Sequence, residues 1–260
     1  ERAGYYQDFG CVDAVARAFC RGSALEGQHA EYRGRRWGRP LVEVPPERLV
    51  VYAQNHDQIG NRADGARLSA LLDPPADRAA LALGLLSPHL PLLFMGQEVG
   101  SRRPFFFYTS FSDARLAAAV LSGRRAEQRA FGWRARCPDP QAVATFDASR
   151  PFEGPAPEAA ARYRALHRDA LALRPALYPG GRPTLVEVSE RPRAFVARGP
   201  AGHVLVAMLD ADGGALDLPE RGGVLFDSEG GAPGLESAPP IAFDGPRVVV
   251  YGPPGPGREE

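Results

Sequence analysis

The sequence predicts an α/β protein in which a parallel sheet, either a barrel or doubly wound, precedes a small antiparallel β-domain. Two apolar runs, residues 48–53 and 91–95, flank a helical stretch at residues 77–86, and polar residues follow each run. This order of strand, helix and strand is typical of parallel sheets. After Pro175 the helical periodicity stops, and short β-prone runs between Gly/Pro turns indicate antiparallel strands.

The first part of the chain is expected to form a helix, a loop and a strand. The amphipathic helix covers residues 11–22, and four apolar residues define one face of it: Val12, Val15, Ala16 and Phe19. A polar, Arg-rich loop follows over residues 31–40. The run 48–53 is apolar without alternation, which predicts a strand that is buried on both faces.

The next elements complete the strand–helix–strand unit. Asp77 is expected to cap the helix at 77–86, and Pro88 follows its end. Residues 91–95 are expected to form a second buried strand that ends at Gly96. Two further helices are expected over residues 113–130 and 158–173.

Five β-prone runs are expected to form the antiparallel domain: Thr184–Val188, Ala194–Ala197, Val204–Leu209, Val224–Phe226 and Arg247–Tyr251. The predicted organisation is therefore an α/β part over residues 1–175, a β-domain over residues 176–252, and a disordered Pro/Gly-rich tail over residues 253–260.

Composition narrows the functional classes. The chain has 260 residues with 31 basic and 31 acidic side chains, so charge does not indicate nucleic acid or an anionic membrane as a partner. The three cysteines, Cys11, Cys20 and Cys137, are odd in number and widely spaced, which predicts buried free thiols and neither a disulfide framework nor a metal site. We find no signal peptide and no apolar run long enough to span a bilayer, so a cytoplasmic location is expected. No dinucleotide fingerprint or P-loop occurs, and no cofactor is expected.

A cluster of polar residues directly follows the first predicted strand. Asn55, His56 and Asp57 stand where the carboxyl end of a parallel strand would carry functional groups, and the loop continues to Arg62 with further donors and acceptors. Such a set suits a polyhydroxylated ligand. A turn in which Asn55 and Asp57 only cap the backbone explains the same spacing.

Two segments of this region resemble a known family. Residues 50–57, Val-Val-Tyr-Ala-Gln-Asn-His-Asp, are similar to the segment at the end of the seventh strand in the alpha-amylase family (glycoside hydrolase family 13). Residues 92–98, Leu-Leu-Phe-Met-Gly-Gln-Glu, are similar to its eighth strand. The resemblance implies the C-terminal portion of a (β/α)8 barrel followed by a β-sandwich domain.

Narrower motifs resemble the branch of this family that releases trehalose. They lie at residues 4–10, 32–36, 55–62, 103–107, 131–133 and 138–149. This branch hydrolyses the α-1,4 bond next to the terminal trehalose of maltooligosyltrehalose by a retaining mechanism. A glucan branching or debranching enzyme and a non-catalytic glucan-binding module are the alternatives. An α-glucan is the expected partner in each case, and the oligomeric state is left open.

The resemblance implies a role for Asp57 and its neighbours. Asp57 corresponds to the carboxylate that holds sugar hydroxyls in subsite −1 and stabilises the transition state. The expected substrate contacts are Asn55, His56, Gln58, Ile59, Gly60, Asn61, Arg62, Phe105 and Phe107.

The family's other two catalytic groups have no counterpart here. The nucleophile Asp and the acid Glu belong to earlier strands, so the chain is expected to be a fragment that is inactive and unstable alone. Glu98 is expected to be structural, the arginines at 33, 35 and 36 to be solvated or salt-bridged, and His89 and His167 to lie on the surface or in the core.

Overall fold

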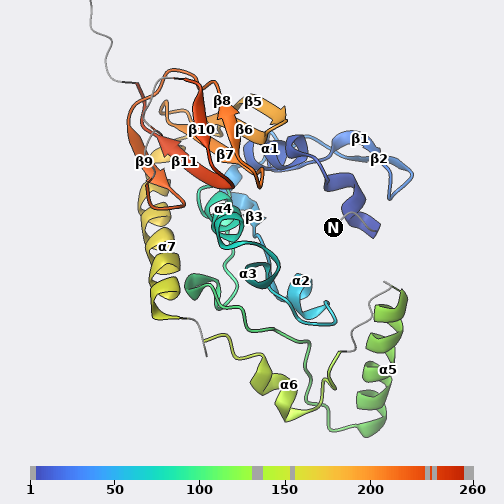
Figure 1. Ribbon diagram of the computed structural model, residues 1–260. Coiled ribbons are helices and arrows are strands. Elements are labelled where there is room, and N and C mark those ends of the chain that lie inside the picture. Colours follow the sequence, from blue (N-terminus) through green and yellow to red (C-terminus); the bar gives the residue numbers. More distant parts are fainter. Residues whose placement is uncertain (1–3, 131–136, 153–155, 232–234, 236–238, 255–260) are drawn as a thin grey trace, which may run out of the picture. The chain divides into compact units, whose positions relative to one another are not determined.

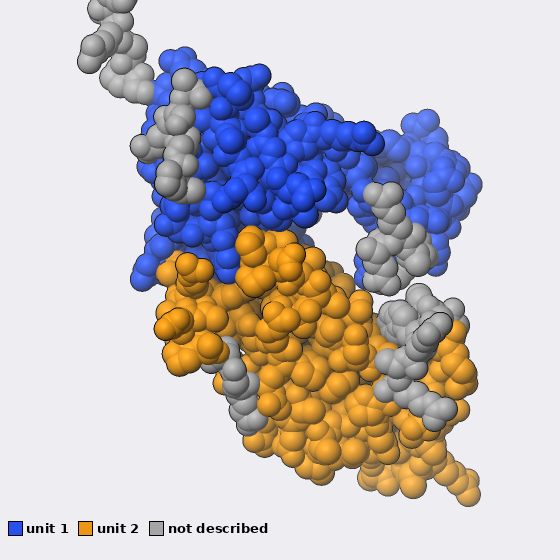
Figure 2. All heavy atoms as spheres, viewed as in Figure 1, with its two compact units in different colours: residues 1–51, 78–91, 166–260 blue, residues 52–77, 92–165 orange. Residues whose placement is uncertain are grey.

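The computed structural model describes residues 4–130, 137–152, 156–231, 235 and 239–254. The chain folds into two compact units, which Figure 2 colours separately. Unit 1 comprises residues 1–51, 78–91 and 166–260, and unit 2 comprises residues 52–77 and 92–165. The predicted motif at 131–133 and the end of the predicted tail, 255–260, lie outside the described residues.

Helix α1 (Val12–Arg21) confirms the predicted N-terminal helix. It follows the 3-10 helix η1 (Gly4–Phe9) and ends at Gly22, whose φ of 88° closes the last turn in the left-handed region. The predicted apolar face is corrected at Val15, which is 37 % exposed. The buried stripe also includes Ala14 and Cys20, because the helix packs against strands β5 (Thr184–Glu190) and β6 (Arg193–Arg198) of the same unit (Figure 1).

The Arg-rich segment forms part of a hairpin, which corrects the predicted loop. Strands β1 (Glu26–Ala30) and β2 (Arg35–Gly38) pair antiparallel. The guanidinium carbons of Arg33 and Arg35 lie 3.8 and 4.7 Å from the ring centroid of Trp37. Exposed cations over an indole stabilise a strand pair that lacks an apolar face, and hydrophobic periodicity therefore does not reveal it.

The predicted parallel pair is present but short. Strand β3 (Val50–Val51) pairs in parallel with β4 (Leu90–Pro91), and helix α4 (Pro74–Leu85) lies between them in the chain. The prediction that the strands are buried is wrong for the described chain, since Val50 is 53 % exposed and, in the second predicted strand, Leu92 and Leu93 are 39 % and 41 % exposed. Each of these strands has only one neighbour, so the described residues build no further sheet over the pair.

The start of α4 differs from the prediction. Asp77 lies inside the helix, and its backbone N–H donates to the carbonyl of Asp73 over 3.0 Å. Its carboxylate accepts a hydrogen bond of 2.6 Å from the Tyr163 hydroxyl and is buried. The first turn of a helix leaves its backbone N–H groups without partners inside the helix, so Pro74 and Pro75, which have no N–H, fit there. The helix therefore begins three residues before the predicted start at residue 77.

The remaining helices follow the predicted ones or fill the loops between them. Helices α5 (Ala114–Ala130) and α7 (Pro157–Leu177) confirm the two long predictions. The shorter helical elements are η2 (Pro46–Arg48), α2 (His56–Gly60), α3 (Leu68–Leu71), η3 (Gln97–Val99) and α6 (Val143–Ala148).

The C-terminal part forms an antiparallel sheet with the strand order β5-β6-β7-β11-β9. These strands confirm the five predicted runs: β5 (Thr184–Glu190), β6 (Arg193–Arg198), β7 (Val204–Met208), β9 (Val224–Asp227) and β11 (Arg247–Tyr251). Two short strands, β8 (Gly214–Leu216) and β10 (Ile241–Phe243), pair separately. Apolar residues of both sheets, among them Val206, Val249 and Phe243, form one buried core, as in a sandwich.

The cysteines and histidines correct one prediction and support others. Cys20 and Cys137 are buried free thiols, whereas Cys11 is exposed. Burial raises the pKa of the Cys20 thiol to about 12, although the nearby Arg21 opposes that shift. His89 is buried, and its ring nitrogens lie 3.1 and 3.4 Å from the carbonyls of Ala18 and Pro46, which confirms a core role.

Candidate active site

The site is built around the short helix α2, whose first turn carries a reciprocal cap. The Asn55 Oδ1 atom accepts from the backbone N–H of Asp57 over 2.7 Å, and Gln58 Oε1 accepts from the N–H of Asn55 over 3.0 Å. This is a capping box, in which two side chains satisfy backbone donors that the helix leaves open. The amide oxygens of Asn55 and Gln58 are therefore already used by the backbone.

The two residues inside this cap point their side chains outward. The His56 and Asp57 side chains are 66 % and 65 % exposed, and His56 Nε2 lies 3.4 Å from Asp57 Oδ1. The two hydrogen bonds of the cap use the side-chain oxygens of Asn55 and Gln58 and not those of Asp57. This corrects the alternative in which the Asp57 side chain caps the backbone. An exposed carboxylate beside an imidazole can accept from two hydroxyls of a ligand while the ring contributes a further donor or acceptor.

A row of aromatic rings continues from this pair. The ring centroids of His56 and Phe94 are 6.5 Å apart, and those of Phe94 and Phe105 are 5.0 Å apart in an edge-on arrangement. Tyr108 lies 5.8 Å from Phe105 and 5.3 Å from Phe146, again edge-on. Edge-to-face rings of this kind hold one another in fixed orientations. The row gives the His56–Asp57 pair an apolar neighbour, and Phe105 is the one ring of this row that the sequence predicts as a substrate contact.

The segment that carries Phe105 packs directly against the loop after α2. The backbone N–H of Phe105 donates to the carbonyl of Gly65 over 2.9 Å. A Cβ atom at Gly60 would lie 3.6 Å from the Phe105 ring and 3.5 Å from the Phe107 nitrogen, so a small residue at position 60 allows close approach. The structure thus brings together the two predicted substrate-contact segments, 55–62 and 105–107, and leaves Phe107 40 % exposed.

The other predicted contact residues differ in accessibility. Ile59 is fully buried and Gly60 is buried, so neither residue presents a side chain to a ligand. The Asn61 Oδ1 atom accepts from Arg124, and Arg62 donates to the Asp64 carboxylate over 3.2 Å. Only the polar edge of this loop is therefore presented outward.

Arg67 is a buried residue of the site that sequence reasoning missed. Its guanidinium donates to the carbonyls of Arg103 and Met95 over 2.6 and 2.7 Å, and lies 5.3 Å from the Phe94 ring centroid. Burial lowers the pKa of Arg67, and the nearby Glu98 carboxylate opposes that shift. Arg67 fixes the backbone on either side of the aromatic row. No local pattern marks it, because its partners lie 28 and 36 residues away.

Glu98 confirms the structural role expected for it. Its Oε2 atom accepts from the backbone N–H of Gly96 over 2.8 Å. Gly96 has a φ of 90°, and a Cβ atom there would lie 2.7 Å from Pro151, so the turn requires glycine. The neighbouring Gln97 accepts from the N–H of Phe94 over 2.6 Å. These side chains shape the exit from β4.

The motif at 138–149 also supports the site rather than forming it. Gln141 Oε1 accepts from the Thr109 hydroxyl over 2.7 Å and from the N–H of Phe111 over 2.9 Å. The Ser149 hydroxyl accepts from the N–H of Phe106 over 3.0 Å. These three hydrogen bonds tie residues 106–111 to the segment 138–149.

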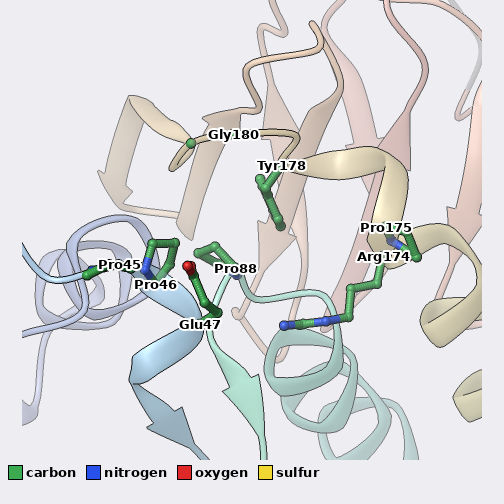
Figure 3. Close-up of a pocket in the computed structure, with 9 residues that line it drawn as sticks. Pro45, Pro46, Glu47, Pro88, Arg174, Pro175, Tyr178 and Gly180 are labelled. Carbon is green, nitrogen blue, oxygen red and sulfur yellow. The ribbon is translucent and has the colours of Figure 1, made fainter.

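A separate hollow of about 600 Å³ lies in unit 1 (Figure 3). Four prolines, Tyr178 and Arg174 are among its lining residues, and the predicted site residues are not. The Arg174 guanidinium donates to the carbonyls of Leu85, Ser87 and His89, so its charge closes the end of α4. The polar groups of Arg174 and Tyr178 in this hollow therefore already have backbone partners.

No group of three or more His, Cys, Asp and Glu in the described residues could hold a metal ion. None of the helices in the described part of the chain is long and apolar enough to cross a membrane.

Comparison with known proteins gives a consistent set of relatives. The chain is 39 % identical over 257 residues to the malto-oligosyltrehalose trehalohydrolase of Arthrobacter ramosus, which covers 96 % of this chain and 43 % of the relative. The Saccharolobus solfataricus enzyme of the same name is 37 % identical over 150 residues, or 58 % of this chain and 26 % of that protein. The chain thus spans less than half the length of these relatives. No family model matches it.

The solved structures agree with these relatives. A Salmonella typhimurium protein provisionally described as an alpha amylase superposes with a TM-score of 0.78 and 32 % sequence identity. The match covers 96 % of this chain and 43 % of that protein. This agreement over almost all of the chain supports the predicted fold class, which is part of an alpha-amylase-type α/β enzyme followed by an antiparallel sheet.

Proposed function

Since this chain is related over nearly its whole length to malto-oligosyltrehalose trehalohydrolases of the alpha-amylase family, we propose that the protein hydrolyses the α-1,4 bond that joins a maltooligosyl chain to terminal trehalose. The substrate is then an uncharged α-glucan, and trehalose is the product. The geometry that supports the proposal most directly is the exposed His56–Asp57 pair, with a separation of 3.4 Å, on a capped helix beside a row of aromatic rings.

In this proposal Asp57 is the carboxylate that stabilises the transition state. Its oxygens accept from two hydroxyls of the sugar in subsite −1, and these bonds strengthen as positive charge develops on the ring. The capping box holds the Asp57 backbone, so the backbone that carries the carboxylate does not have to be ordered when the substrate binds. His56 binds the same sugar from its position beside the carboxylate.

The surrounding residues bind the rest of the substrate. Asn61 and Arg62 lie at the polar edge of the loop, and Phe107 offers an exposed ring to a pyranose face. Phe105 is held in the aromatic row between Phe94 and Tyr108. Asn55, Gln58, Ile59 and Gly60 contribute through the shape of the loop and its backbone. The nucleophile and the acid of the retaining mechanism are not assigned to residues of this chain.

The proposal also extends to architecture and location. The parallel pair β3–β4 corresponds to the seventh and eighth strands of a (β/α)8 barrel, within residues 1–175, and residues 176–252 form the C-terminal β-domain. Free thiols at Cys20 and Cys137 are compatible with a reducing compartment, so we place the enzyme in the cytoplasm.

The test is a product assay on maltooligosyltrehalose with the complete natural protein and its Asp57→Asn variant. We expect the wild type to release trehalose and the variant to lose about 100-fold or more in kcat, because an amide is a weaker acceptor for the developing charge. Asp113→Asn is the matched control, since Asp113 caps α5 and Asn caps equally well.

The outcomes separate the possible activities. Trehalose release that depends on Asp57 supports the proposal. New α-1,6 branches would identify a branching enzyme, and glucan binding without any bond cleavage would identify a binding module. Trehalose release that is unchanged in Asp57→Asn would remove Asp57 from the mechanism.

A further inference from the structure

A single arginine on α5 contacts three of the proposed substrate-contact positions. Arg124 Nη1 donates to Asn61 Oδ1 over 2.7 Å, and Nη2 donates to the carbonyl of Gly60 over 2.7 Å. Its guanidinium carbon lies 4.9 Å from the ring centroid of Phe107. We propose that Arg124 is a positioning residue for substrate binding, which orders Asn61 and Phe107 without touching the reacting bond. This inference rests on the proposed function.

The contacts define which end of α2 depends on Arg124. The start of α2 is held by the capping box, which fixes the backbone of Asp57. Its end has no such cap, and the carbonyl of Gly60 is one of the acceptors that a helix leaves open at its C-terminus. A cation at this position satisfies the carbonyl and also interacts favourably with the helix dipole.

The chemistry of arginine suits this role better than that of lysine. The planar guanidinium presents two nitrogens that donate in parallel and a face that stacks on an aromatic ring. Glu127, three residues along the helix, accepts from Arg124 Nη1 over 3.2 Å and restricts its orientation. The Arg124 side chain is only 12 % exposed, so these bonds lie largely out of competition with water.

The expected consequence is a change in substrate affinity rather than in the chemical step. Without Arg124, Asn61 and Phe107 must be ordered when the substrate binds, and immobilising a side chain costs about 0.5–1.5 kcal/mol, which corresponds to a factor of about 2 to 12. We therefore expect Arg124→Ala to raise KM about fivefold or more while kcat changes by less than about threefold. Asp57 retains its own anchor in the capping box, which is the reason for the small effect on kcat.

The matched control is Arg125→Ala, which removes the same side chain from an exposed position one residue along α5. We expect this variant to keep the wild-type KM. Arg124→Lys should restore part of the affinity, because an ammonium group can donate to Asn61 or Gly60 but does not provide the guanidinium fork. The melting temperature of each variant reports whether α5 stays folded.

A double-mutant cycle with Asn61 tests the coupling. If Arg124 acts through Asn61, adding Arg124→Ala to Asn61→Ala raises KM by less than it does in the wild type. The inference fails if Arg124→Ala has the same KM as Arg125→Ala. It also fails if the increases in KM from Arg124→Ala and Asn61→Ala are fully multiplicative in the double variant, or if Arg124→Ala lowers kcat and the melting temperature at unchanged KM.

Failure of this inference is distinguishable from failure of the proposed function. If the wild type releases trehalose in an Asp57-dependent manner and Arg124→Ala has a normal KM, only the positioning role is wrong. If the wild type releases no trehalose, the proposed function fails and the role of Arg124 fails with it.

Discussion

Asn55 and Gln58 use their amide oxygens for the backbone of α2, and this decides what the neighbouring residues can do. Four polar residues in a row offer several side chains to a ligand, but only His56 and Asp57 remain outside the cap with most of their surface exposed. Two of these four residues therefore hold the backbone, and the other two are available to a ligand. An Asn55→Ala variant would remove the support, whereas Asp57→Asn removes the chemistry alone.

His89 makes the stability of unit 1 dependent on pH. Burial lowers its pKa below the ordinary value of 6.5, with a smaller contribution from Arg182 in the same direction. Above pH 6.5 the ring is neutral in the folded and unfolded chains, and its contribution to stability is fully present. As the pH falls below this value, the unfolded chain takes up the proton first and the folded state loses stability, until the lowered pKa is reached.

We therefore expect the free energy of unfolding to decrease as the pH falls below 6.5. His89→Gln removes this titration, so the slope should fall by up to about 1.4 kcal/mol per pH unit. Denaturant unfolding at a series of pH values measures the effect, and His29→Gln is the control at an exposed position. An unchanged slope in His89→Gln would contradict the assignment. His203, whose pKa is also lowered by burial, leaves a residual slope.

At the scale of elements, α1 shows how a helix predicted from periodicity acquires its partner. The Phe19 ring packs 5.6 Å from the ring of Phe195 on β6, and the backbone N–H of Val12 donates to Glu190 at the end of β5 over 3.0 Å. These partners lie more than 170 residues away along the chain. The amphipathic pattern identifies the face that is buried but not the sheet that covers it.

Removing the Phe19 ring should destabilise unit 1 strongly. Phe19 is almost fully buried between α1 and the sheet, and Phe→Ala changes in a core typically cost about 3–5 kcal/mol. Val15→Ala on the same helix is the control, and it should cost less than about 1 kcal/mol because Val15 is largely outside the core. Chemical denaturation measures both. Equal losses in the two variants would show that α1 does not dock through Phe19.

At the scale of the whole molecule, a largely buried ion pair joins distant parts of unit 1. Arg78 on α4 donates to both carboxylate oxygens of Glu229, which follows β9, with an Nε–Oε1 distance of 2.9 Å. The two residues are separated by 151 positions. The pair ties the helix between β3 and β4 to the C-terminal sheet, which the linear order of the elements does not predict.

Breaking this pair should cost more than breaking an exposed one. Glu229→Gln removes one carboxylate charge from a largely buried contact with Arg78, and we expect a loss of about 3 kcal/mol in the free energy of unfolding. Asp169→Asn breaks the exposed pair with Arg168 and should leave the stability unchanged within error. Denaturant unfolding of the two variants decides the matter, since equal effects would mean that burial does not strengthen the Arg78–Glu229 contact.

The sequence by itself determined the elements whose signals are local. Apolar runs and turns located the five strands of the C-terminal sheet, and helical periodicity located α1, α5 and α7. The order of strand, helix and strand predicted the parallel pair β3–β4. The position of Asn55 to Asp57 just after the predicted strand at residues 48–53 identified the candidate site, because polar groups at the end of a parallel strand are visible in the sequence.

Only the tertiary structure decided how those elements meet and which residues support the site. Arg67 and Arg124 contact the aromatic row and the α2 loop from 28 to 64 positions away, and neither stands in a pattern that marks it. The hairpin β1–β2 is stabilised by cations over Trp37 and has no apolar periodicity. Local patterns report the backbone state and the buried face of a segment, whereas hydrogen bonds and ring contacts between distant segments exist only after the chain has folded.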